Sequence, residues 1–106
     1  MGSWDTANVT SLYRTFANAT SFNQPIGSWN VANVTDMNAM FGSASNFNQD
    51  ISSWNTANVI AMQYMFYRTY NFNQPINTWN VVKVTSFSEF RTFSALSNEN
   101  TPPKFL

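Results

Sequence analysis

The hydrophobic positions of this chain recur with a period of 25 residues. The columns that carry the period are Trp4, Trp29, Trp54 and Trp79; Val9, Val34, Val59 and Val84; Phe22, Phe47 and Phe72; and Ile26, Ile51 and Ile76. A period of about 20 to 50 residues is typical of repeat proteins, in which each unit buries its apolar face against its neighbours. The sequence therefore predicts a single repeat domain of about four stacked coils. Their boundaries are 4–28, 29–53, 54–78 and 79–106.

Within each unit, the apolar residues lie three and four positions apart. In the second unit these residues are Val34, Met37, Met40, Phe41, Ala44 and Phe47. This spacing predicts an amphipathic helix, and Thr35 and Asp36 suit its first turn. We therefore expect short helices near residues 10–19, 35–44, 60–69 and 85–93.

The segment that follows each predicted helix is too short for a second one. Residues 48–53 most simply form a short strand. Pro25 and Pro75 occupy the place of Asp50, and proline is tolerated at the first residue of a strand. Equivalent strands would stack as a narrow parallel sheet, about 4.8 Å per coil. The expected fold class is α/β: a short leucine-rich-repeat-like solenoid of about four coils, each with one helix and one strand.

Residues that recur between units are expected to form the core. They are Trp4, Trp29, Trp54, Trp79, Met37, Met40, Phe41, Phe47 and Ile51. A ladder of tryptophans could instead stack on sugars, but Trp is also a large core filler whose indole N–H can reach a loop carbonyl. The Asn columns could likewise form a polar binding strip. We favour Asn side chains that bond the backbone of the next coil, because buried backbone groups need partners.

The two ends of the array depart from the repeat in different ways. Met1-Gly2-Ser3 is interpreted as an expression scar. The first coil has no preceding strand or cap, so we expect it to fray or to form a homodimer through its open edge. At the other end, Arg91 takes the place of the repeated Phe, and the apolar residues Phe87, Phe90, Phe93 and Leu96 predict a tail that caps the last coil.

Composition narrows the possible functions. Five basic residues balance five acidic ones, so no basic field favours nucleic acid. Aromatic residues make up 17% of the chain, which argues against disorder despite sixteen Asn. The sequence has no Cys and no His, and its acids sit at different repeat positions. We therefore expect no enzyme, no cofactor, no metal site and no membrane insertion.

The repeat also resembles a known family. Its unit runs from Trp29-Asn30-Val31-Ala32-Asn33-Val34-Thr35-Asp36-Met37 through Met40-Phe41 to Phe47-Asn48-Gln49-Asp50-Ile51. This unit closely resembles the BspA-type leucine-rich-repeat surface proteins, in particular the repeat of mycoplasma surface lipoproteins. The resemblance implies an extracellular or cell-surface location and a role in adhesion or host contact. It implies no particular ligand.

Three functions remain open on the sequence. The first is a non-catalytic module for protein or glycan recognition or adhesion, whose partner is a host or matrix protein or a glycan. The second is a structural or self-assembling spacer element. The third is a flat binder of ice or crystalline polysaccharide, suggested by the columns Thr6 and Thr56, and Thr10, Thr35 and Thr85, although Val31, Val81 and Ile60 interrupt them.

One cluster is a candidate partner site. Tyr64, Tyr67 and Arg68 fall on outward positions of the third predicted helix, and Tyr70 follows close behind. Tyr and Arg are enriched at binding hot spots. The alternative interpretation is that these side chains only shield their neighbours or contact the next coil.

Overall fold

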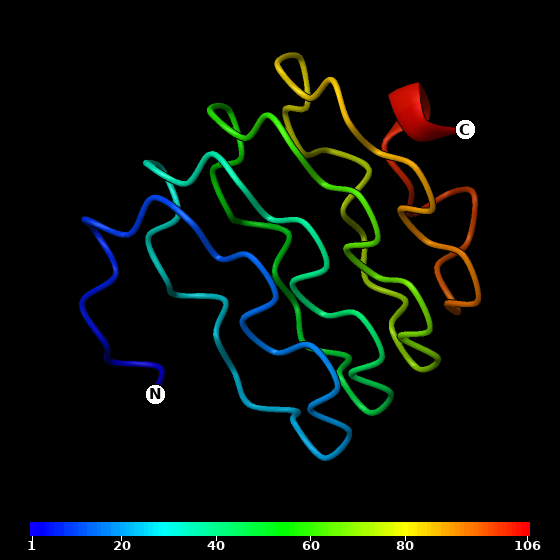
Figure 1. Ribbon diagram of the computed structural model, residues 1–106, viewed down its shortest axis with the longest axis horizontal. Helices are drawn as coiled ribbons and strands as arrows, with labels where there is room; N and C mark the ends of the chain where they lie inside the picture. Colours follow the sequence, from blue (N-terminus) through cyan, green and yellow to red (C-terminus); the bar gives the residue numbers. More distant parts are fainter.

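Residues 1–106 of the computed structural model wind into four stacked coils that consist almost wholly of turns (Figure 1). Successive coils lie side by side in parallel, joined by single bridges at one frame position, that is, one position of the 25-residue repeat. These bridges are Ser11–Asp36, Asp36–Ala61 and Ala61–Ser86. The one regular helix is η1, a 3-10 helix at Pro103–Phe105. The N-terminus and the C-terminus lie at opposite ends of the stack (Figure 1).

The expected α/β architecture is wrong, because neither the helices nor the strands form. All 46 backbone hydrogen bonds belong to turns or run between segments, and none lies within a helix or a strand. In the second coil the N–H groups of Met40, Ala44 and Phe47 close turns onto the carbonyls three residues earlier. An α-helix would need bonds to the fourth residue back.

Turns also explain the spacing that suggested helices. The turns 37–40, 41–44 and 44–47 begin and end on inward apolar residues and place two polar or small residues outside. Inward residues therefore recur every three or four positions without a helix. The alternate N–H groups leave the coil instead: those of Met37, Ala39 and Phe41 donate to the third coil, at 2.9, 2.8 and 3.0 Å.

Left-handed residues recur at two frame positions. They are Arg14, Asn18, Ala39, Ser43, Tyr64, Arg68, Glu89 and Phe93, with φ between 54° and 64°. Each of the first two coils has such a residue third in a turn, where a type II turn requires positive φ. The conformation costs a non-glycine residue about 1–2 kcal/mol, so the bonds to the neighbouring coil must offset it.

The expected strands are replaced by side-chain bonds between coils. Asn23 Oδ1 accepts the N–H of Asn48 at 2.9 Å, and Asn48 Oδ1 accepts that of Asn73 at 3.0 Å. The amides of Gln49 and Gln74 donate to the same Asn residues, at 3.0 Å and 3.1 Å. The Asn and Gln columns thus join the coils where a sheet was expected.

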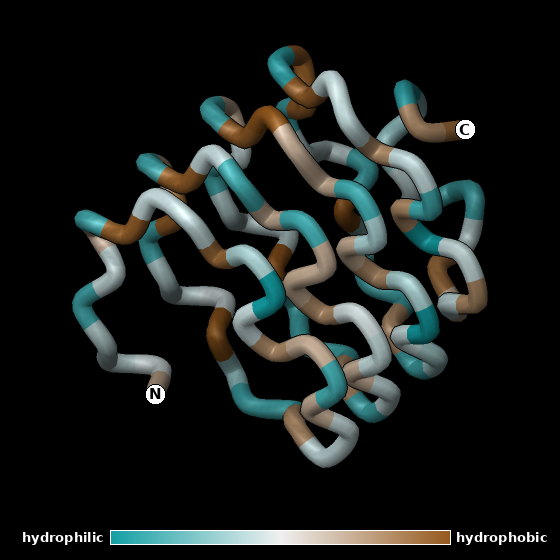
Figure 2. Tube along the Cα trace, viewed as in Figure 1, coloured by the Kyte–Doolittle hydropathy of each residue, from teal (hydrophilic) through white to brown (hydrophobic).

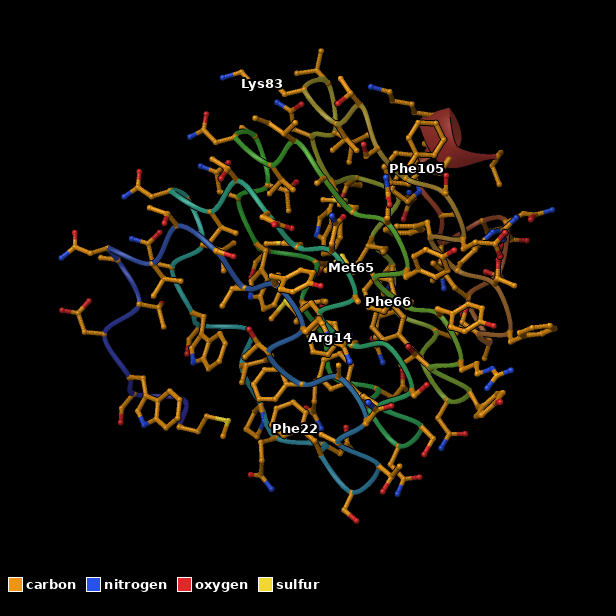
Figure 3. All side chains as sticks on the ribbon, viewed as in Figure 1. Arg14, Phe22, Met65, Phe66, Lys83 and Phe105 are labelled. Carbon is orange, nitrogen blue, oxygen red and sulfur yellow. The ribbon has the colours of Figure 1, made fainter.

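Hydrophobic segments recur at equivalent places on successive coils (Figure 2) and meet in one core. Met37, Met40, Phe41, Phe47 and Ile51 are fully buried there. Like rings stack between coils, with centroids 5.5 Å apart for Phe41–Phe66 and 6.3 Å for Trp54–Trp79. Met65 and Phe66 lie inside the stack (Figure 3).

Three of the four tryptophans expected in the core are buried, and Trp4 is 60% exposed. Each buried indole N–H donates to a backbone carbonyl 28 residues earlier in the chain. The bonds are Trp29 to Met1 at 3.0 Å, Trp54 to Ile26 at 3.1 Å and Trp79 to Ile51 at 3.1 Å. The Met1 carbonyl therefore accepts an indole N–H in the same way as the carbonyls of Ile26 and Ile51.

The C-terminal tail lies over part of the last coil. Phe105 lies in η1 at the C-terminal end of the stack (Figure 3). Its ring stacks on Phe87 and meets Phe90 at 55°, with centroids 4.6 Å apart in both pairs. The Lys104 ammonium donates to the carbonyls of Val81 and Val84, at 3.1 and 2.6 Å. These carbonyls belong to the final coil, so the lysine supplies donors on the side where no further coil is stacked.

Candidate functional site: a groove across the first three coils

A groove of about 390 Å³ crosses the turn face of the first three coils. Its lining residues are Tyr13, Arg14, Ala17, Asn18, Asn38, Ala39, Gly42, Ser43, Gln63, Tyr64 and Tyr67. All of them occupy the outward positions of the turns described above. The left-handed residues at two of these frame positions fix how each turn presents its side chains.

The groove exists because the second coil carries small side chains between larger ones. Its floor residues are Ala39, Gly42 and Ser43. The first coil contributes Tyr13 and Arg14 as one wall, and the third contributes Tyr64 and Tyr67 as the other. The equivalent of Gly42 in the third coil is Tyr67, so one frame position is a floor in one coil and a wall in the next.

The third-coil wall is packed. The rings of Tyr64 and Tyr67 meet edge to face, with centroids 5.3 Å apart and planes at 81°. The Arg68 guanidinium lies 5.2 Å from the centroid of the Tyr67 ring, within range of a cation–π contact. Phe93 from the fourth coil lies 5.9 Å from Tyr67. These contacts limit the freedom of Tyr67, which is half-buried.

The structure brings three of the four expected partner-binding residues together. Tyr64, Tyr67 and Arg68 are in contact, although through turns and not on a helical face. Tyr70 is 56% exposed and does not line the groove. The opposite wall, Tyr13 and Arg14, was not predicted from the sequence. Comparing side-chain size down each frame column would have pointed to it.

The chemistry of the lining is neutral and polar around aromatic rings. Arg14 is the one charged side chain among the lining residues. The Asn38 side-chain carbonyl accepts the backbone N–H of Gln63 at 2.7 Å, which fixes that amide. The groove therefore offers tyrosine rings, phenol hydroxyls and side-chain amides. This set suits a ligand that has both an apolar face and hydroxyl or amide groups.

The expected structural classes can now be compared with known proteins. A family model described as Mycoplasma protein of unknown function, DUF285, matches residues 1–103. The chain belongs to this family. The match spans all four coils and begins at Met1, which lies in the repeat frame with Ile26. The curated proteins and the solved structures that were searched gave no match.

The family description corrects part of the earlier expectation. It names a mycoplasma family but states no function. It therefore gives no support to the leucine-rich-repeat, adhesion or lipoprotein character expected from the sequence. The turn-built coils also contradict a helix-and-strand solenoid. No helix of the structure has the length and apolarity needed to span a bilayer.

Proposed function

We propose that this chain is a non-catalytic recognition module that binds a glycan segment or a loop of a host or matrix protein in the groove over the second coil. The observation that carries the proposal is the pair of tyrosine walls, Tyr13 and Tyr64 with Tyr67, on either side of a floor of small residues. Tyr13 and Tyr64 are exposed and take no part in the stacking of the core, so their rings can contact a ligand.

The dimensions favour a glycan over a folded protein surface. A volume of about 390 Å³ falls in the usual range of ligand pockets, about 300–1,000 Å³. A stable protein interface needs about 800 Å² on each partner, far more than a groove lined by eleven residues offers. Tyrosine faces and neutral amides match the apolar faces and hydroxyls of a sugar better than a charged ligand.

A cell-surface location is part of the proposal. It is supported by the resemblance of the repeat to BspA-type surface proteins. Recognition of an external glycan or protein would be the natural use of a binding groove there.

The test is an array of neutral oligosaccharides and matrix proteins probed with the chain and three variants. Gly42→Tyr places on the floor the residue that the third coil already carries at that frame position, so it fills the groove while the repeat tolerates the side chain. Tyr64→Ser with Arg68→Ser removes one wall tyrosine and the guanidinium that lies against the other, Tyr67. Tyr70→Ser removes an exposed tyrosine that lies outside the groove.

We expect the first two variants to weaken binding about tenfold or more, since tyrosines in such positions act as hot spots. Tyr70→Ser should bind like the parent. All three should melt within a few degrees of the parent. Binding that survives Gly42→Tyr would place the ligand elsewhere, and a chain that binds nothing on either array would remove the basis for a recognition module.

A further inference from the structure

The junctions inside the stack use a row of backbone bonds at alternate residues. Between the third and fourth coils the bonds run from N–H to carbonyl: Met62 to Ser86 at 2.8 Å, Tyr64 to Ser88 at 3.0 Å, Phe66 to Phe90 at 2.9 Å and Arg68 to Thr92 at 2.9 Å. The same four frame positions are used at both other junctions. Along this stretch each coil therefore presents donors on one side and acceptors on the other. Just before the row, one bond at each junction runs the opposite way: Thr35 to Thr10, Ile60 to Thr35 and Thr85 to Ile60.

The two end coils leave one such row each without a partner in the chain. On the fourth coil the N–H groups of Phe87, Glu89, Arg91 and Phe93 donate to no group of the chain. On the first coil the carbonyls of Ser11, Tyr13, Thr15 and Ala17 accept from none. The row on the fourth coil holds only donors and the row on the first coil only acceptors, at the same frame positions that join the inner coils.

Three of the four donor residues, Phe87, Glu89 and Arg91, line a hollow beside the part of the core that the tail covers. This hollow of about 540 Å³ is lined by Gln63, the run 85–92 and Phe105. Phe105 fills the end of the core, where it contacts Phe87 and Phe90. The hollow therefore gives access to the backbone edge of the fourth coil and not to a bare hydrophobic face.

Charge agrees with the backbone pattern. Arg14 in the first coil and Glu89 in the fourth occupy the same frame position, and both are exposed. In a stack continued by one more coil, residues of one column lie about 4.8 Å apart. A first coil placed next to the fourth would thus set the Arg14 guanidinium beside the Glu89 carboxylate.

We propose that a second copy of this chain docks its first coil on the donor row of the fourth coil. Phe87, Glu89, Arg91 and Phe93 then donate to the carbonyls of Ser11, Tyr13, Thr15 and Ala17 of the other copy. A symmetric dimer through two first coils would instead set carbonyls against carbonyls. The contact is head to tail, so it does not close and permits further copies to add. The acceptor side of this contact shares Tyr13, Arg14 and Ala17 with one wall of the groove, so association is measured with no glycan or protein ligand present.

Sedimentation velocity of the full chain from micromolar to millimolar concentration, at low salt, tests the contact. The variants are Arg14→Glu and Glu89→Arg, examined singly and as an equimolar mixture. The same frame position holds Ala39 and Tyr64, so the turn accepts varied side chains. Glu99→Arg makes the same change of charge at an exposed residue of the tail.

We expect concentration-dependent association of the parent and a Kd about fivefold higher for each single variant, because each charge reversal loses an exposed ion pair and sets like charges side by side. Mixing the two variants should restore association, because both junctions of an alternating stack then pair opposite charges. Glu99→Arg should associate like the parent. A parent that stays monomeric throughout overturns the proposal. So does a mixture no more associated than its components, or an association that Arg14→Glu weakens and Glu89→Arg leaves unchanged.

Discussion

Replacing two tryptophans of the same column by alanine tests how the stack is held together. Trp54 and Trp4 share a frame position, but Trp54 is 4% exposed and Trp4 is 60% exposed. Trp54 donates its indole N–H to Ile26 in a buried bond and stacks between coils, whereas the indole N–H of Trp4 donates to no group of the chain. Trp54→Ala should therefore destabilise the protein far more than Trp4→Ala.

The size of the effect follows from burial and from the lost hydrogen bond. A buried aromatic side chain removes about 150–250 Å² from water, which corresponds to about 4–6 kcal/mol at 25 cal/mol per Å². Measured substitutions of this kind cost about 3–5 kcal/mol. Leaving the Ile26 carbonyl without a donor adds about 1–3 kcal/mol. We expect about 5 kcal/mol for Trp54→Ala and less than about 2 kcal/mol for Trp4→Ala, in proportion to its smaller burial.

Urea unfolding followed by circular dichroism measures both free energies. A loss of about 5 kcal/mol is a large share of the stability of a small domain, so Trp54→Ala should be close to unfolded at room temperature. Trp54→Phe keeps most of the buried area and removes only the indole N–H, so it separates the two contributions. Equal losses for Trp4→Ala and Trp54→Ala in dilute solution would refute the difference in burial on which the reasoning rests.

Three further substitutions test other parts of the structure. Ala39→Gly should raise the free energy of unfolding by about 0.5 kcal/mol, because relief of the left-handed backbone exceeds the entropy that glycine loses. Ala44→Gly, at a buried residue without positive φ, should lower the free energy of unfolding. A fall for both variants would contradict backbone strain at Ala39. Lys104→Met should lower the melting temperature and speed amide exchange in the last coil, since it removes the donors to that coil's carbonyls; unchanged exchange there would contradict the capping role. Ser52, through its hydroxyl and then its backbone N–H, lowers the pKa of the Asp50 carboxylate. The Asp50 carboxylate therefore adds stability above its unfolded pKa of about 3.9, and this stability is lost as the pH falls through the lower folded pKa. When the free energy of unfolding is measured against pH, Asp50→Asn should lose less stability in acid than the parent. Identical pH dependences would argue against the interaction with Ser52.

The repeat and its core could be predicted from the sequence because large apolar side chains recur at the same positions of each unit. Stacked coils need the same contacts at every level, so Trp, Phe and Ile recur in columns and the columns identify the core. Trp4 is the exception, and its exposure follows from its place in the first coil. A column shows which residues face inward, but burial also requires a neighbour on each side.

The type of local structure could not be read from the same pattern. Inward residues three and four positions apart fit an amphipathic helix, and they fit consecutive turns that begin and end on inward residues equally well. The residues at the outward positions distinguish a helix from consecutive turns. The pairs Gly42-Ser43 and Ser45-Asn46 are turn formers, whereas an exposed helix face normally carries Ala, Glu, Lys or Gln. Weighing the outward positions as heavily as the inward ones would have favoured turns.

The candidate site was only half predictable for a related reason. Tyr64, Tyr67 and Arg68 stand out in one unit, because they are large residues at places where other units have small ones. The groove depends instead on a comparison between neighbouring coils, with Ala39 and Gly42 low between two walls. Such a feature belongs to the order of the units along the stack and not to any single unit.

This arrangement separates what holds the coils together from what varies on their surface. Backbone bonds between alternate residues, the Asn and Gln columns and the indole N–H groups join each coil to the next. Among the side chains at the outward turn positions that line the groove, only that of Asn38 adds a hydrogen bond between coils. Those positions hold residues as different as Gly42 and Tyr67 at one place in the frame, so side-chain size there can change from coil to coil while the junction stays the same. A groove then arises wherever a coil with small outward residues lies between coils with large ones. Along the stack axis, the unpaired donor row on the fourth coil and acceptor row on the first coil occupy the frame positions that form the backbone bonds of the inner junctions.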